Sequence, residues 1–84
     1  LRNHGLLTCA DNIPDAFLFM FIFQRACEIQ LKAQATGQKL IPIHSAILQG
    51  IRAQASEVTK QAGGSLAWPG IKRRVARRFP GFDE

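Results

Sequence analysis

The chain has 84 residues, is 46% hydrophobic and carries a formal net charge of +5. This length allows one compact unit at most, because so short a chain buries only roughly 60% to 65% of the surface that its unfolded form exposes. The two cysteines, Cys9 and Cys27, are too few for a disulfide-rich secreted scaffold and lack the close spacing of a zinc ribbon or redox motif. We expect buried free thiols in the cytoplasm.

The hydrophobic residues do not predict a membrane span. The longest apolar run, from Ala16 to Phe23, is far shorter than the roughly 20 residues that a spanning helix needs. A basic segment followed by a small-residue cleavage site is also missing near Leu1, so the sequence gives no support to secretion.

Residues 1–10 have the alternation of a strand. Arg2, His4, Leu6 and Thr8 would share one face, because successive strand residues point to opposite sides. The pattern predicts a strand over about 1–10, followed by a turn.

A long helix is predicted over about 13–36. Asn12 suits the N-cap, Pro14 is tolerated in a first turn, and Asp15 gives a weak capping-box signal. Gly37 stands where a left-handed C-cap is favoured. The first half of this helix is apolar all round, which predicts burial between layers.

Two more helices are predicted, over about 45–62 and about 67–78. Ser45 is expected to cap the first, and Gly63-Gly64 to stop it. The second is marked by the apolar spacing of Trp68, Ile71, Val75 and Phe79. One strand cannot form a sheet, so this set of elements is incomplete, and we expect the missing strands upstream.

The sequence resembles the class II aldolase/adducin family. The resemblance rests on Asn3-His4-Gly5, on the helix start at Ile13-Pro14-Asp15-Ala16-Phe17 and on Arg25-Ala26-Cys27-Glu28-Ile29-Gln30, with Trp68, Arg74, Pro80 and Gly81-Phe82 following. It implies that the chain is the C-terminal fragment of an α/β domain, a three-layer αβα fold with a largely antiparallel sheet. The fragment itself, with one strand and about three helices, would be mostly helical.

His4 is the candidate metal ligand. The resemblance implies that His4 joins two histidines of an upstream His-x-His in holding a divalent metal, usually zinc, with the acid/base carboxylate also upstream. A strand-edge histidine taken by itself is more often structural than a ligand. His44, in a polar connector, is expected to be a solvated loop residue, and Cys9 to lie in the core. The sequence identifies no catalytic residue.

Two further groups have simple structural interpretations. In Arg25-Ala26-Cys27-Glu28-Ile29-Gln30, Glu28 is either an orienting group or, as we favour, the partner of Arg25 in an intrahelical pair. The phenylalanines of the long helix are expected in the core or a subunit interface rather than around a ligand; they are Phe17, Phe19, Phe21 and Phe23.

The basic residues of the last helix form an amphipathic segment: Lys72, Arg73, Arg74, Arg77 and Arg78. Such a segment can bind nucleic acid, acidic lipid or calmodulin-like partners. No nucleic-acid-binding motif accompanies it. We therefore expect a solvated face and no specific nucleic-acid binding, with contact to an acidic upstream surface or a substrate phosphate as alternatives.

The resemblance implies two functions for the intact protein. One is a metal-dependent lyase or epimerase acting on small, often phosphorylated, hydroxy-carbonyl compounds; the other is an adducin-like binding or scaffold protein without catalysis. His4 favours the enzyme, whereas Phe82 stands near the place of a family tyrosine that this sequence lacks. The resemblance also implies a homo-oligomer, commonly a tetramer, and an inactive isolated fragment.

Overall fold

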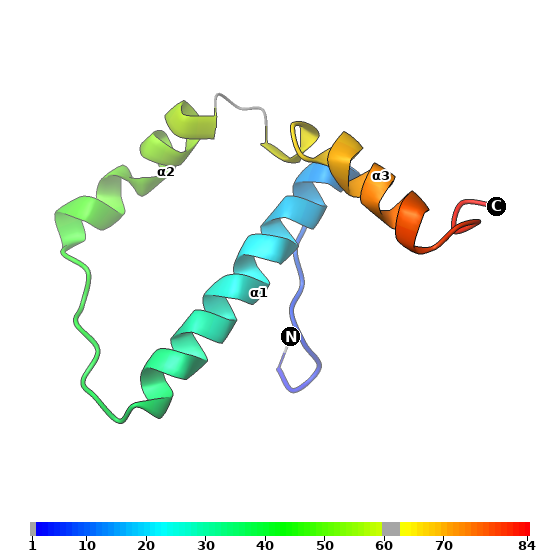
Figure 1. The fold of residues 1–84 in the computed structure, drawn as a ribbon. Coiled ribbons are helices and arrows are strands. Elements are labelled where there is room, and N and C mark those ends of the chain that lie inside the picture. Colours follow the sequence, from blue (N-terminus) through cyan, green and yellow to red (C-terminus); the bar gives the residue numbers. More distant parts are fainter. Residues whose placement is uncertain (1, 60–62) are drawn as a thin grey trace.

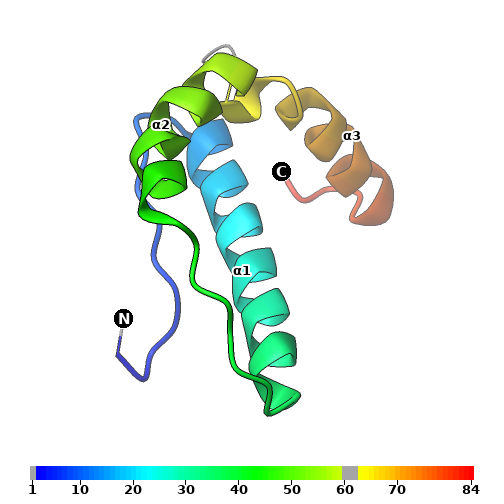
Figure 2. The ribbon, with the colours of Figure 1, turned by 90° about the vertical axis from the view of Figure 1, so that its left-hand side faces the viewer.

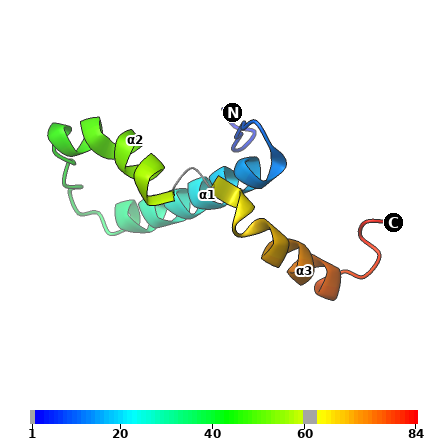
Figure 3. The same ribbon diagram turned by 90° about the horizontal axis from the view of Figure 1, so that it is seen from above.

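The computed structural model describes residues 2–59 and 63–84 as an all-helical arrangement. Its elements, in chain order, are α1 (Ile13–Ala35), α2 (Ser45–Thr59), the single 3₁₀ turn η1 (Gly63–Ser65) and α3 (Trp68–Arg78). Figure 1 shows α1 as the central element, with α2 and α3 on opposite sides of it, and the view from above in Figure 3 agrees. The helices α2 and α3 therefore extend away from α1, and the three helices do not pack as a bundle.

The helix α1 starts where its cap chemistry predicts. The Asn12 side-chain oxygen accepts a hydrogen bond from the backbone N–H of Asp15 at 2.9 Å, and the Asn12 amide donates to the Asp15 carboxylate at 2.9 Å. The first bond pairs the Asp15 backbone N–H, which the start of a helix otherwise leaves without an intrahelical partner. The second bond joins the two side chains. At the other end Gly37, with φ of +71°, donates its N–H to the Gln34 carbonyl at 3.1 Å.

The helix α2 begins at Ser45, but Ser45 is not its cap. His44 holds that position: its backbone carbonyl accepts from Ile47 N at 3.0 Å, and its Nδ1 accepts from Ala46 N at 3.2 Å. The predicted serine cap was therefore wrong by one residue. The last residues of the helix predicted over about 45–62 lie outside the described residues.

The strand predicted over about 1–10 is not formed. Residues 2–4 make a turn and residues 5–10 have neither helical nor strand structure, and no strand occurs in the described ranges. A strand needs a neighbouring strand to pair its backbone N–H and C=O groups, and the described chain offers none. The three-layer αβα arrangement thus remains a prediction, whereas the mostly helical character is observed. A hydrogen bond from Thr8 Oγ1 to the Ala16 carbonyl oxygen, 3.1 Å long, joins this segment to α1.

The described residues contain no buried hydrophobic side chain. The radius of gyration is 16.6 Å, against about 12 Å for a compact domain of this length. The phenylalanines of α1, expected in a core or an interface, are between 39% and 51% exposed, and Cys9, also expected in the core, is exposed. Among residues 2–59 and 63–84, no second layer covers α1 beyond its first turns. Figure 2 shows how much of α1 stands clear of α2 and α3.

The contact that does form joins η1 to the start of α1. Gly64 is buried, and its N–H donates to Asp15 Oδ1 at 2.7 Å across 49 residues of sequence. A Cβ on Gly64 would overlap the carbonyl group of Pro14, and a Cβ on Gly63, whose φ is +51°, would overlap the Asp15 carboxylate. Two glycines are therefore required for this close approach, which positions α3 against α1.

Candidate functional site

His4 lies at the end of an exposed turn whose backbone is specialised. Asn3 has φ of +60°, a left-handed conformation that asparagine tolerates better than most residues. Gly5 has φ of +135°, a backbone conformation that residues with a Cβ rarely adopt. The Asn3-His4-Gly5 sequence thus folds into a sharp bend that leaves the imidazole exposed to solvent.

A hydrogen bond orients the His4 ring. Its Nδ1 lies 2.8 Å from the backbone carbonyl oxygen of Arg2. A carbonyl oxygen only accepts hydrogen bonds, so Nδ1 carries the hydrogen, and in the neutral ring the lone pair is on Nε2. A metal-bound histidine usually has this arrangement, in which one nitrogen donates to a carbonyl or carboxylate and the other is free to coordinate.

The described residues do not form a metal centre around His4. Within residues 2–59 and 63–84, no cluster of three or more histidine, cysteine, aspartate or glutamate side chains is placed to hold a metal ion. His44 is an exposed residue of the connector, as expected, and its Nδ1 accepts a hydrogen bond from Ala46 N at the start of α2. Catalytic zinc takes three protein ligands, so the described residues do not supply a complete set.

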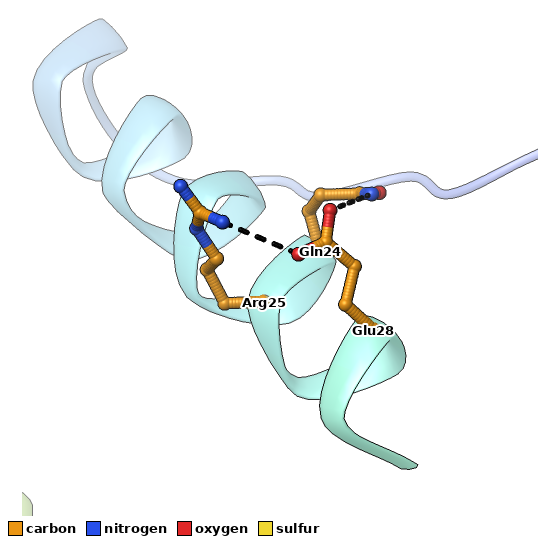
Figure 4. Close-up of polar contacts among 3 residues, drawn as sticks. All are labelled: Gln24, Arg25 and Glu28. Atoms are coloured by element: carbon orange, nitrogen blue, oxygen red, sulfur yellow. Dashed lines mark hydrogen bonds and ion pairs between the residues drawn. The ribbon is translucent and has the colours of Figure 1, made fainter. Parts of the chain in front are cut away.

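The most family-like stretch of α1 carries an exposed polar network. Arg25 Nη1 lies 3.2 Å from Glu28 Oε2, and Gln24 Nε2 donates to Glu28 Oε1 at 3.3 Å, as Figure 4 shows. The hydrogen bond from Gln24, followed by the charge of Arg25, lowers the pKa of Glu28 below its usual 4.5. The Arg25 guanidinium also lies 5.4 Å from the centre of the Phe21 ring. The intrahelical pair is confirmed, and nothing in this network resembles a catalytic group.

Sequence reasoning missed an aromatic cluster between α1 and α3. The rings of Phe17 and Trp68 are 5.7 Å apart, and those of Phe17 and Phe21 are 6.4 Å apart. The sequence pattern predicts these phenylalanines in the core or a subunit interface but gives no indication that α3 meets Phe17. The Gly63-Gly64 pair was the available signal, since adjacent glycines often mark a close backbone approach.

Comparison with known proteins identifies the family. The family model "Class II Aldolase and Adducin N-terminal domain" matches residues 1–31, which include the turn at His4 and most of α1. The "Putative aldolase class 2 protein" of Pseudomonas aeruginosa is 47% identical over 98% of the chain, and its counterpart in Caulobacter vibrioides is 36% identical over 98%. The chain belongs to the class II aldolase and adducin family.

The relatives also include proteins with adducin names. Human gamma-adducin is 33% identical to this chain in a match that includes 79% of the chain and 9% of gamma-adducin. The chain spans about one third of the length of the two bacterial relatives, 33% and 32% respectively. No solved structure gives a significant match. Among the described residues no helix is both long and apolar enough to cross a membrane.

Proposed function

We propose that this chain contributes His4 as a metal ligand to a metal-dependent lyase or epimerase that acts on small, often phosphorylated, hydroxy-carbonyl compounds. The observation that carries the proposal is the hydrogen bond between His4 Nδ1 and the Arg2 carbonyl, 2.8 Å long, on an exposed ring. That bond sets the tautomer and points to Nε2 as the coordinating atom. The aldolase name of the Pseudomonas aeruginosa relative supports the reaction class.

The residues present fit one part of a metal centre. His4 supplies a nitrogen of the kind that zinc prefers, and its side chain is exposed beside the bend at Gly5. The remaining ligands, and the acid/base group, must come from other parts of the whole protein. When bound, a divalent metal, most simply zinc, would polarise the carbonyl or hydroxyl oxygen of the substrate.

The assembly and location of the protein are part of the same proposal. The half-exposed phenylalanines of α1 supply apolar surface suited to burial in a homo-oligomer such as a tetramer. Two free thiols, of which Cys9 is exposed, fit the reducing environment of the cytoplasm.

The second candidate is an adducin-like protein that binds partners without catalysis. Two observations favour it: the match to human gamma-adducin over 79% of the chain, and the absence of any tyrosine from the sequence, where Phe82 stands near the place of the family tyrosine. In that case the fold would be kept and no metal would be bound.

The experiment compares two histidine variants of the intact protein that carries this chain. His4→Ala should remove bound metal, measured by elemental analysis, together with turnover of a panel of phosphorylated aldoses and ketoses. His44→Ala is the matched control, because His44 caps α2 and should leave metal content and turnover unchanged. A wild-type protein that purifies metal-free and inert while binding a protein partner would favour the adducin-like function.

A further inference from the structure

Both residues that flank His4 have a positive φ. Asn3, with φ of +60°, is the one residue other than glycine in the described ranges with a positive value, and Gly5 has φ of +135°. Residues with a Cβ adopt such conformations rarely, because the Cβ comes too close to a neighbouring carbonyl oxygen. A Cβ built on Gly5 would meet nothing within 4 Å, so glycine is required there for backbone conformation and not for close packing.

The conformation of Asn3 decides where the Arg2 carbonyl points. The angle φ of Asn3 describes rotation about its N–Cα bond, which joins the peptide plane of the Arg2 carbonyl to the rest of the turn. At φ of +60° the carbonyl oxygen lies 2.8 Å from His4 Nδ1. A change to the negative φ that most residues prefer would rotate this peptide plane by about 120° or more and move the oxygen away from the ring.

The bond to the Arg2 carbonyl determines which nitrogen of His4 is free. In water a neutral imidazole carries its hydrogen mainly on Nε2, and in a protein the hydrogen bond that the ring makes decides which nitrogen is protonated. An acceptor beside Nδ1 therefore keeps the hydrogen there and leaves the lone pair on Nε2. A carbonyl that points elsewhere would remove this control.

We propose that Asn3 is a positioning residue for His4 and that it acts through its left-handed backbone rather than through its side-chain amide. This inference rests on the proposed function, in which His4 is a metal ligand. Asparagine suits the position because it tolerates φ near +60° better than most residues. The Asn3 side chain is exposed, so exchanging it should leave the packing of the chain unchanged.

Two variants of Asn3 in the intact protein separate backbone from side chain. In Asn3→Val the branched Cβ makes a positive φ costly, so the hydrogen should move to Nε2 and zinc should bind about tenfold or more weakly, as when a partner of a ligating histidine is lost. Asn3→Gly removes the same amide but adopts a positive φ readily, so it should keep the hydrogen on Nδ1 and bind zinc within about threefold of the wild type.

The matched control for backbone strain is Gly5→Ala. It places a Cβ on a residue with φ of +135°, yet the φ of Gly5 is not among the torsions that link the Arg2 carbonyl to the His4 ring. The hydrogen should therefore stay on Nδ1. Nitrogen-15 NMR of the metal-free protein reads the position of the hydrogen, competition with a chelator gives the zinc affinity, and circular dichroism checks that each variant is folded.

Three results would overturn the proposal. An Asn3→Val protein with the hydrogen on Nδ1 and unchanged zinc affinity would show that φ of Asn3 does not control the ring. A loss in Asn3→Gly as large as that in Asn3→Val would assign the role to the amide, and an equal change in Gly5→Ala would assign it to general strain in the turn. Wild-type metal content in His4→Ala would instead contradict the proposed function, while the ring spectra of the metal-free variants would still decide the role of Asn3.

Discussion

Replacing Gly64 by alanine should detach α3 from α1. The new Cβ would overlap the Pro14 carbonyl group and lie 2.9 Å from Asp15 N, and both contacts are with backbone that cannot rotate away. Gly64 is buried in this contact, so an added methyl group would lie between η1 and α1. The substitution must therefore lift η1 from the first turn of α1.

The cost follows from the two contacts that depend on this docking. The hydrogen bond from Gly64 N to Asp15 Oδ1 has a carboxylate acceptor and contributes about 1.5 to 3 kcal/mol. The Phe17 and Trp68 ring contact adds about 0.5 to 1.5 kcal/mol. Losing both should shift the docking equilibrium by about 2 to 4.5 kcal/mol, or roughly 30- to 1,600-fold.

Trp68 fluorescence measures this shift directly. In Gly64→Ala the emission should move to longer wavelength, because the ring loses Phe17 and gains water, while far-ultraviolet circular dichroism keeps most of the helix signal. Gly50→Ala is the matched control: its Cβ would meet one atom, the Gln54 Nε2 at 3.9 Å, so helix propensity alone should stabilise α2 by about 1 kcal/mol. An unchanged Trp68 spectrum in Gly64→Ala would refute the account of how α3 is positioned.

Three further predictions concern the ends and faces of α1 and the thiols. Asn12→Ala should destabilise the first turn of α1 by about 1 kcal/mol, seen as reduced helicity and faster amide exchange at Asp15. The pKa of Glu28 is lowered in the folded chain, so its contribution to stability is complete above the unfolded value near 4.5 and is lost as pH falls through the lower folded value; Glu28→Gln should remove this part of the acid dependence of α1 helicity. Cys9 is exposed and Cys27 half-buried, so a thiol reagent should modify Cys9 first, and equal rates in Cys9→Ser and Cys27→Ser single variants would contradict that difference.

Local chemistry predicted α1 well. Asn12 and Gly37 define its ends through bonds to residues within one turn, so the information lies within a few residues of each boundary. The same holds for the Arg25 and Glu28 pair, whose spacing fixes its geometry. The start of α2 was misassigned by one residue because both His44 and Ser45 can accept a bond from a backbone N–H, and sequence alone does not rank them.

Features that depend on distant partners were not predictable in this way. The alternation in residues 1–10 indicates a strand only if another strand pairs with it, and none does among the described residues. The position of α3 against α1 depends on the contact of Gly64 with Asp15, 49 residues away, which no local sequence period encodes. The resemblance supplied His4 as a candidate, but the bond that orients its ring became apparent only with the backbone bend at Asn3 and Gly5.

The most direct test of the metal-ligand role is nitrogen-15 NMR of the His4 ring in the intact protein, assigned by its loss in His4→Ala. Before metal is added, Nδ1 should carry the hydrogen and Nε2 should show the shift of an unprotonated nitrogen, as the bond to the Arg2 carbonyl requires. On addition of one equivalent of zinc, the Nε2 signal should move while Nδ1 stays protonated. A hydrogen on Nε2, or ring signals that zinc leaves unchanged, would contradict the assignment of His4 as a metal ligand.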